Sequence, residues 1–589
     1  MRSRDRPSSL LALTIGVALV ALAVVAWTRA EAPRVFFSGD EGLKSVQRRA
    51  FAEGRETLSD PSRQLAAAVT AGSAAGTTRP KVASLSPWRP PFVQPCAGGL
   101  CSVWRNPVVR IGGVAERVGG PPLAAAVAWL GLVLWLLATA LLALRLGASA
   151  AGTAAALLFG TPAWLYGVVF WEHAPAAAAV TAALAWTLGE RSVGSRPRMA
   201  RAVVVAAGLG AAVALAVLSR PESGLLVIVA AALAWRRRHR AELAAWVVGG
   251  LVAGSLALWL GDGLAGWVGN NVSRAATGEG DWLNRRSLQS ATLLAGLRGG
   301  SAPSGATAGL AASTAGILLL ARWAPPRVVR SLGWLLLATS AAALASLWAW
   351  PGAQIVGLLL AAPVAVIGLA SGLRAAPTAH GPAAAAQGPS ADAPAPSTDA
   401  RLLAIGCALS LLAALLASPN DGGSQWGPRY LLPWLAPTLA FALAAPAAWR
   451  PLVRAALVLG LVAQLIGVRN LASQQADKSA AIRWLLASPA RTLVAQAWYT
   501  PQELAGLSLD SRSLDHGWQL ALAADLPALQ RATDALVTRE ERWWIFAADP
   551  RLNAAGLLGR GGHWRVVGSR DVGFPPVQVR LHLIEAQRP

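Results

Sequence analysis

Long apolar runs that contain no charged residue constrain this chain more than any other feature of its sequence. Runs at 10–27, 123–144, 202–218 and 355–369 approach the length, about 20 residues, that a helix needs to cross the hydrocarbon core of a bilayer. Only helices and closed barrels satisfy every backbone hydrogen bond inside lipid. Because the runs lack the polar–apolar alternation of barrel strands, they predict an all-α polytopic membrane domain that lies in a lipid bilayer.

The charged residues lie mainly between the apolar runs, and most of them are arginine. The formal net charge is +23, from 52 Lys and Arg against 29 Asp and Glu. The arginines are scattered between membrane-length runs, so they indicate orienting charges on cytoplasmic loops and exclude nucleic acid as a partner. With a cytoplasmic N-terminus, this pattern predicts about 13 transmembrane helices. They are expected at 9–28, 122–144, 150–170, 174–189, 202–218, 224–235, 242–260, 305–321, 331–349, 353–372, 401–418, 431–447 and 455–469.

The segments between the helices predict the domain organisation. The first helix reads as uncleaved, because its apolar run exceeds the usual signal-peptide core of about 7–15 residues. The stretch 261–304 is expected outside the cytoplasm, with a re-entrant or interfacial helix as one option. The expected parts are a first helix (1–28), a long extracytoplasmic loop (29–121), a helix bundle (122–372), a disordered cytoplasmic linker (373–400), further membrane helices (401–469) and a small C-terminal extracytoplasmic α/β domain (470–589).

The composition of the chain changes after about residue 470, where Asp and Glu return between short apolar segments. This part predicts helices at 501–507 and 525–539, with Asp525 as a candidate N-cap. It predicts strands at 492–498, 543–547, 564–567 and 577–584. The order of helix and strand permits a partly parallel sheet.

Two of the three cysteines lie close together in the long loop. Cys96 and Cys101 flank a small turn that we place outside the cytoplasm, where a disulfide is stable. Two unrelated thiols remain the alternative, whereas a zinc site needs more Cys or His at ligand spacing. Cys407 lies inside an apolar run and reads as core packing.

Charged and polar residues of the types used in catalysis and binding flank helix ends on the predicted extracytoplasmic side. Each has a simpler interpretation: a solvated loop carboxylate, a helix cap, or an anchor at lipid headgroups. Trp88, Trp104, Trp282 and Trp426 similarly suit either sugar stacking or an interfacial aromatic belt. The candidates are Asp40, Glu41, Glu172, His173, Arg220, Glu222, Arg429 and Tyr430.

The pair Asp40-Glu41 opens a segment that reads as an amphipathic helix lying on the membrane surface. Carboxylates at its start are favoured by the partial positive charge of a helix N-terminus. Because four separate outer turns carry acids, an imidazole and guanidinium groups, the sequence predicts an extracytoplasmic active site.

Four short motifs together resemble the GT-C glycosyltransferases, which are integral membrane enzymes using polyprenyl-phosphate-linked sugars. The motifs are FFSGDEGLKSVQ at 36–47, WEHAP at 171–175, SRPE at 219–222 and QWGPRYLLP at 425–433. An outer α/β domain after the last helix is similar to the aminoarabinose and protein mannosyl transferase branches. The resemblance covers most of the helical part, but the loop between Gly54 and Pro121 has no matching motif.

The resemblance implies an inverting transfer of a sugar from a polyprenyl-phosphate donor to a glycan, lipid or protein acceptor. It implies that Asp40 takes the proton of the acceptor hydroxyl. Glu41 or Glu172 would orient the acceptor or hold a divalent cation such as Mg or Mn. The charge that builds on the leaving phosphate would be met by Arg429 and secondarily by Arg220.

Two other functions remain open. A transporter or flippase of a lipid-linked substrate needs charged or broken helices near the bilayer midplane, and often repeats. A non-catalytic membrane scaffold, with a binding domain outside, would leave the polar turns dispersed. The richness in Ala, Gly and Arg indicates a bacterial inner membrane as the location.

Overall fold

The structure is a computed structural model in which the described residues divide into two compact units. Unit 1 comprises Asn106–Val108 and Ala125–Val468, and unit 2 is built from Val25–Arg105, Val109–Ala124 and Arg469–Pro589. Description begins at residue 36 and ends at residue 587. Gaps of four or more residues lie at 74–84, 190–195, 269–281, 299–304, 350–353, 375–397, 419–425, 510–517, 538–541, 548–564 and 574–579, with shorter gaps elsewhere.

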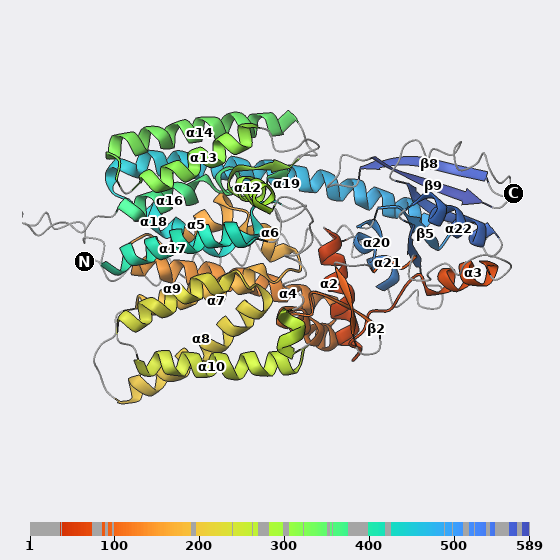
Figure 1. Ribbon diagram of the computed structural model, residues 1–589, viewed down its shortest axis with the longest axis horizontal. Coiled ribbons are helices and arrows are strands. Elements are labelled where there is room, and N and C mark those ends of the chain that lie inside the picture. Colours follow the sequence, from red (N-terminus) through yellow and green to blue (C-terminus); the bar gives the residue numbers. More distant parts are fainter. Residues whose placement is uncertain are drawn as a thin grey trace, which may run out of the picture. The chain divides into compact units, whose positions relative to one another are not determined.

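Unit 1 is helical because its apolar runs satisfy their backbone hydrogen bonds within each segment. Helices α8 and α10 lie side by side, and α7 packs against α8 and α9 (Figure 1). The helices are α4 (Pro107–Arg145), α5 (Ala150–Gly160), α6 (Ala163–Val168), α7 (His173–Thr187), α8 (Arg196–Ser219), α9 (Ser223–Arg236), α10 (Arg240–Trp259), α12 (Trp282–Ala295), α13 (Gly305–Leu320), α14 (Pro326–Ala349), α15 (Leu358–Ala361), α16 (Pro363–Arg374), α17 (Thr398–Ala417), η2 (Arg429–Trp434), α18 (Leu435–Leu443), η3 (Ala447–Trp449) and α19 (Arg450–Ala487).

Within the described residues, 6 helices are long and apolar enough to cross a membrane. Three shorter apolar helices, Ala150–Gly160, Ser223–Arg236 and Pro363–Arg374, accompany them. By length and composition the chain is therefore a multi-pass membrane protein. The predicted first helix at 9–28 and most of the predicted linker at 373–400 lie outside the described residues.

Proline residues account for two differences from the predicted helices. A helix was expected over 353–372, but α15 ends at Ala361 and α16 begins at Pro363. At this break, the backbone carbonyl of Ala361 accepts a hydrogen bond of 2.7 Å from the side-chain amide of Gln464. A helix was also expected over 431–447, but the chain forms the 3₁₀ helix η2 and then the short α18. Proline has no backbone N–H to donate and cannot continue the regular ladder.

Helices α4 and α19 are longer than predicted. Helix α4 begins at Pro107 and is interrupted at Gly119 and Gly120, where the backbone leaves helical geometry. Gly120 has φ of 73°, which glycine adopts without strain. Helix α19 runs to Ala487, well past the predicted end at 469. The stretch 261–304 contains α12, a helix that the sequence left as an option.

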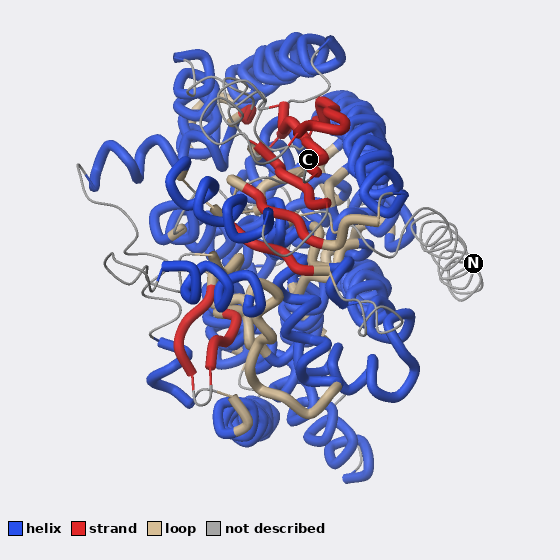
Figure 2. The backbone as a smooth tube through the Cα atoms, turned by 90° about the vertical axis from the view of Figure 1, so that its right-hand side faces the viewer, coloured by secondary structure: helices blue, strands red, loops and turns tan. Residues whose placement is uncertain are grey.

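Unit 2 contains a five-stranded mixed sheet of order β6-β5-β7-β9-β8 (Figure 2). Strand β5 is parallel to β6 and β7, whereas β9 is antiparallel to β7 and β8. Four of the strands overlap predicted ones, and β6 was missed. The strands are β5 (Thr492–Ala495), β6 (Gln519–Leu522), β7 (Arg542–Ala547), β8 (Arg565–Gly573) and β9 (Arg580–Gln587).

The long loop near the N-terminus helps to build the core of this sheet. Helix α3 (Arg63–Ser73) packs against α22 (Leu526–Val537), and Leu65 and Leu85 join the buried cluster around Val494 and Ile545. The amide of Leu522 also donates to the carbonyl of Leu85 at 2.9 Å. Unit 2 is thus made from two segments that are far apart in the sequence.

A short hairpin completes the described part of the long loop. Strands β1 (Val93–Cys96) and β2 (Gly99–Ser102) are antiparallel. A disulfide joins Cys96 to Cys101 across them. Cys101 is fully buried within unit 2. Cys407 is a buried free thiol in unit 1.

Candidate functional site

Three of the four sequence motifs meet within unit 1. Glu172 precedes the first turn of α7 and His173 begins that helix. Arg220 stands between the end of α8 and the start of α9, and Tyr430 lies in η2. Helix α7 packs against α8, α9 and η2, so these short segments converge.

Arg220 is the centre of this cluster. Its Nε donates to Oε1 of Glu222 at 2.7 Å, and its Nη1 lies 3.5 Å from Oε1 of Glu172. The side chain of Glu172 is 1% exposed and that of Arg220 is 7% exposed. A buried guanidinium is stable only when it is paired, and here two carboxylates supply that pairing.

Two guanidinium groups lie close to the ring of Tyr430. The Cζ atoms of Arg220 and Arg429 each lie 5.2 Å from its centroid, within the range of cation–π contacts. Nη2 of Arg429 also donates to the Tyr430 hydroxyl at 3.3 Å. Unlike the buried Arg220, Arg429 is partly exposed, so its guanidinium lies at the edge of the cluster.

A tight backbone turn brings Arg429 to this place. Gly427 has φ of 92°, and a Cβ atom added there would lie 2.4 Å from a side-chain carbon of Pro162. The hydroxyl of Tyr166 donates to the carbonyls of Trp426 and Gly427 at 3.3 and 3.4 Å. Only glycine suits both the backbone angle and the space at this turn.

His173 packs in an aromatic group rather than in a metal-ligand set. Its ring centroid lies 5.0 Å from that of Tyr166 and 5.4 Å from that of Trp171. Among the described residues there is no group of three or more His, Cys, Asp or Glu placed to hold a metal ion. Glu172 and Glu222 both engage Arg220. A divalent cation stays a prediction of the family resemblance.

The fourth motif lies in unit 2, where it forms the start of α2 (Gly39–Ala52). The Ser38 hydroxyl accepts a hydrogen bond from the amide of Glu41 at 3.3 Å and caps the helix. Asp40 and Glu41 lie in its first turn and are partly exposed. Acidic side chains in the first turn stabilise a helix through its dipole.

The prediction that this helix lies on the membrane surface is wrong. Most of α2 is buried within unit 2, including the apolar Leu43, Val46 and Phe51 and the polar Lys44 and Gln47. A surface helix would leave its polar face in water. Helix α2 instead packs against α20 (Thr500–Glu503) and β2, which fixes its orientation in unit 2.

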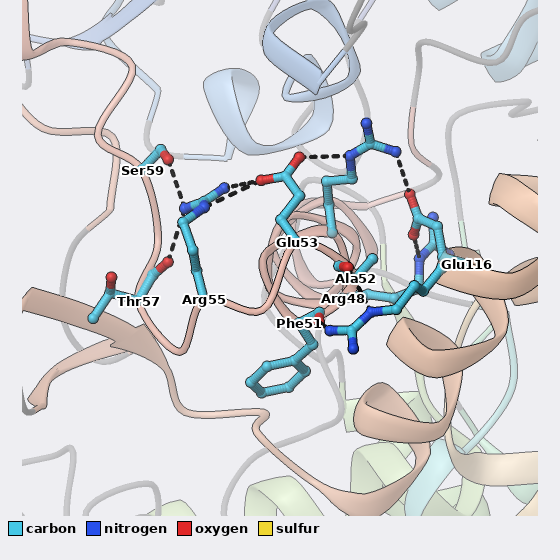
Figure 3. A network of polar contacts seen from close by, with 10 residues as sticks. Arg48, Phe51, Ala52, Glu53, Arg55, Thr57, Ser59 and Glu116 are labelled. Carbon is cyan, nitrogen blue, oxygen red and sulfur yellow. Dashed lines mark hydrogen bonds and ion pairs between the residues drawn. The ribbon is translucent and has the colours of Figure 1, made fainter.

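A network of arginine and glutamate side chains holds the far end of α2 (Figure 3). Glu116 accepts from Nε of Arg48 at 2.7 Å and from Nη1 of Arg49 at 3.1 Å. Arg117 donates to the carbonyls of Phe51 and Ala52 at 2.7 and 2.8 Å. These bonds tie α2 to the first part of α4 and satisfy carbonyls at the helix end.

Glu53 extends the network at the end of α2. It accepts hydrogen bonds from Arg49 and Arg55, and Arg55 also donates to the Ser59 hydroxyl (Figure 3). Partial burial raises the pKa of Glu53, but the hydrogen bonds and charges of Arg55 and Arg49 outweigh burial and lower it. The carboxylate therefore stays ionised at neutral pH.

The tryptophans proposed for sugar stacking do not form an open platform. Trp88, Trp104 and Trp426 are 2%, 7% and 0% exposed, because they belong to packed cores. The side chain of Trp282 lies outside the described part of the chain. Stacking on a sugar requires an accessible ring face, so the buried tryptophans serve packing.

Sequence reasoning missed a buried ion pair in unit 2. Nζ of Lys478 lies 2.7 Å from Oε2 of Glu503, and both side chains are 3% exposed. Lys478 lies on α19 within the part assigned to unit 2, and Glu503 ends α20. The one available signal was an isolated lysine in a chain whose cations are nearly all arginine.

Comparison with known proteins found two similar solved structures, both of ArnT from Cupriavidus metallidurans. One is bound to undecaprenyl phosphate, with 16% identity, a TM-score of 0.41 and coverage of 97% of each chain. The other is the apo state, with 16% identity, a TM-score of 0.39 and coverage of 98% of each chain. Both neighbours are structures of a GT-C glycosyltransferase, the family whose motifs this chain resembles.

Neither a family model nor a curated protein matches the chain. At these identities and TM-scores the likeness assigns no activity, and the chain's own residues carry the proposal that follows.

Proposed function

We propose that this protein is an inverting membrane glycosyltransferase. It moves a sugar from a polyprenyl-phosphate donor to an acceptor at the extracytoplasmic face of a bacterial inner membrane, with its N-terminus in the cytoplasm. The observation that carries the proposal is the convergence of Glu172, Arg220, Glu222, Arg429 and Tyr430 from three distant parts of the sequence. A scaffold with dispersed polar turns would not bring these groups together in one buried cluster, because burying charged groups is costly.

The chemistry divides between the two guanidinium groups. Arg220 is already paired with Glu172 and Glu222, so it stabilises the cluster and directs Tyr430. Arg429 lies partly exposed at the edge and presents its donors to an incoming phosphate. Arginine suits this task because its fork of N–H groups matches phosphate oxygens.

The reaction we propose is a single displacement. The Asp40 carboxylate accepts the proton of the acceptor hydroxyl as that oxygen attacks the anomeric carbon. The bond between this carbon and the phosphate oxygen breaks, and the polyprenyl phosphate leaves with the electron pair. Arg429 meets the charge that develops on the leaving phosphate. Attack opposite the leaving group inverts the anomeric centre.

Donor recognition is tested by binding of undecaprenyl phosphate to the purified full chain in detergent, followed by native mass spectrometry. Charge-assisted hydrogen bonds contribute about 1.5–3 kcal/mol, so Arg429→Gln should raise the Kd roughly 10- to 150-fold. Arg454→Gln removes an exposed arginine of α19 in the same unit and is the matched control. Equal binding by wild type and Arg429→Gln would remove Arg429 from the donor site.

Transfer is tested by the release of undecaprenyl phosphate from a panel of undecaprenyl-phosphate-linked sugars in native membranes. Loss of a general base costs about 10²- to 10⁴-fold, so Asp40→Asn should lower the rate by that factor. Asp60→Asn makes the same change in the same loop, where Asp60 accepts from Ser62, and should be active. Full activity of Asp40→Asn would exclude Asp40 as the base.

One observation favours a transporter as a second candidate. Two expected membrane helices are broken, between α15 and α16 and at η2, and broken helices form the substrate sites of many transporters. Movement of a labelled undecaprenyl-phosphate-linked sugar across vesicles, without any transfer to an acceptor, would favour this function.

A further inference from the structure

The buried pair Lys478–Glu503 has no part in the reaction proposed above, yet it lies beside the start of α2. Nζ of Lys478 donates to the carbonyl of Phe36 at 3.5 Å. The amide of Phe36 donates to the backbone carbonyl of Glu503 at 3.0 Å. Both members of the pair therefore hold the backbone two residues before Ser38, the cap of α2.

The backbones of α2 and α20 are in direct contact at the same place. A Cβ atom added at Gly42 would lie 1.8 Å from the carbonyl oxygen of Gln502, and one added at Gly39 would lie 2.8 Å from its Oε1. At Gly42 the backbones of the two segments meet directly, and at Gly39 only the side chain of Gln502 lies between them. A shift of Glu503 would therefore reach the first turn of α2 directly.

The charged groups around Glu503 make the pair sensitive to change. The pKa of Glu503 is raised to about 7, chiefly by burial; Lys478 acts to lower it and the negative charge of Glu41 to raise it. The pKa of Tyr499 is raised chiefly by its own burial and further by the charge of Glu503. Lys478 is thus the cation paired with Glu503, and Glu503 in turn lies close enough to the acidic turn to feel the charge of Glu41.

We propose that Lys478 and Glu503 are positioning residues that fix the Asp40–Glu41 turn in the orientation needed for proton transfer. The catalytic part of this inference rests on the proposed function, whereas the mechanical part does not. The pair acts through Phe36 and the α2–α20 contact, and neither member touches the reacting atoms.

The mechanical part is tested by hydrogen–deuterium exchange of the full chain in nanodiscs at pH 8. Glu503→Gln should speed exchange of amides 38–43 at least tenfold, and by a larger factor than it speeds exchange of the β5 amides. Glu116→Gln is the matched control, because Glu116 is an equally buried glutamate at the opposite end of α2. It should loosen residues 47–54 and leave 38–43 unchanged.

A single substitution leaves a buried charge without its partner, which can unfold the unit. The double variant Lys478→Met with Glu503→Gln removes both charges and keeps similar volumes. It should retain protection in β5 and still lose it at 38–43. Wild-type protection at 38–43 in the double variant would overturn the inference.

The catalytic part is tested with the same variants in the transfer assay. A positioning role predicts at least a tenfold loss of kcat with an unchanged KM for the donor, whereas general destabilisation would lower the amount of active enzyme without changing the pH profile. An unchanged kcat in a variant with faster exchange at 38–43 would overturn the positioning role and leave the proposed function intact. A wild-type protein without any transferase activity would overturn the proposed function. The exchange result at 38–43 would still test the mechanical part of the inference.

Discussion

The pH dependence of stability in unit 2 should carry the signature of a single carboxyl group. Glu503 has its pKa raised from 4.5 to about 7, chiefly by burial. Between these two values the folded state holds a proton that the unfolded state has released. The free energy of unfolding must therefore fall as pH rises from about 4.5 to about 7, and level off above that range.

The size of the effect follows from the shift. Each pKa unit corresponds to 1.36 kcal/mol, so a shift from 4.5 to about 7 is worth about 3 kcal/mol. The double variant Lys478→Met with Glu503→Gln removes the titrating carboxyl together with its partner, so it should lack this slope. The single variant Glu503→Gln is unsuitable here, because an unpaired buried lysine can add a pH dependence of its own.

The assay is hydrogen–deuterium exchange of the β5 amides in the full chain, measured from pH 5 to pH 8 and corrected for the intrinsic exchange rate. The difference in opening free energy between wild type and the double variant should change by about 2–3 kcal/mol over this range. Histidines titrate equally in both proteins and cancel. A constant difference, or one of opposite sign, would refute the assignment of the near-neutral carboxyl to Glu503.

Three further substitutions test the packing of the two units. Gly42→Ala places a methyl group against the Gln502 carbonyl and should destabilise unit 2 by about 1–3 kcal/mol, measured by exchange of the β5 amides. Cys101→Ser removes the disulfide between cysteines 5 residues apart and should cost about 2 kcal/mol in the same measurement. An unchanged stability of the wild-type protein after reduction would contradict this prediction. Gly427→Ala strains a residue at φ of 92° against Pro162, and should weaken undecaprenyl phosphate binding about tenfold while thermal stability measured by light scattering falls by a few degrees; unaltered binding would show that this turn does not place the donor site.

The membrane character of the chain and the cluster in unit 1 were accessible from sequence for simple reasons. Apolar runs report their environment residue by residue, because every position of a spanning helix meets lipid or another helix. The order of the motifs also indicated that Glu172, Arg220 and Arg429 belong together. Helix packing brings these residues together, because α7 contacts α8, α9 and η2.

Other features escaped the sequence because their causes are long-range. The burial of α2 depends on partners that the local pattern does not contain, so an amphipathic segment was read as a surface helix. The pair Lys478–Glu503 forms between two helices of unit 2, and neither residue stands in a recognisable motif. Strand β6 is short and Ala- and Leu-rich, and its neighbours in the sheet rather than its own residues define it.

The union of the long loop with the last strands has a consequence for biosynthesis. Phe36 and Lys478, which meet beside the acidic turn, are separated by 442 positions in the chain. Contacts between residues so far apart in the sequence form late, because the intervening chain must first be made and folded. The ribosome therefore synthesises nearly the whole protein before α2 can pack against Lys478 and Glu503. A nascent or truncated chain carries Asp40 without the contacts of Lys478 and Glu503 that hold the start of α2, so the proposed activity would begin only after synthesis is complete.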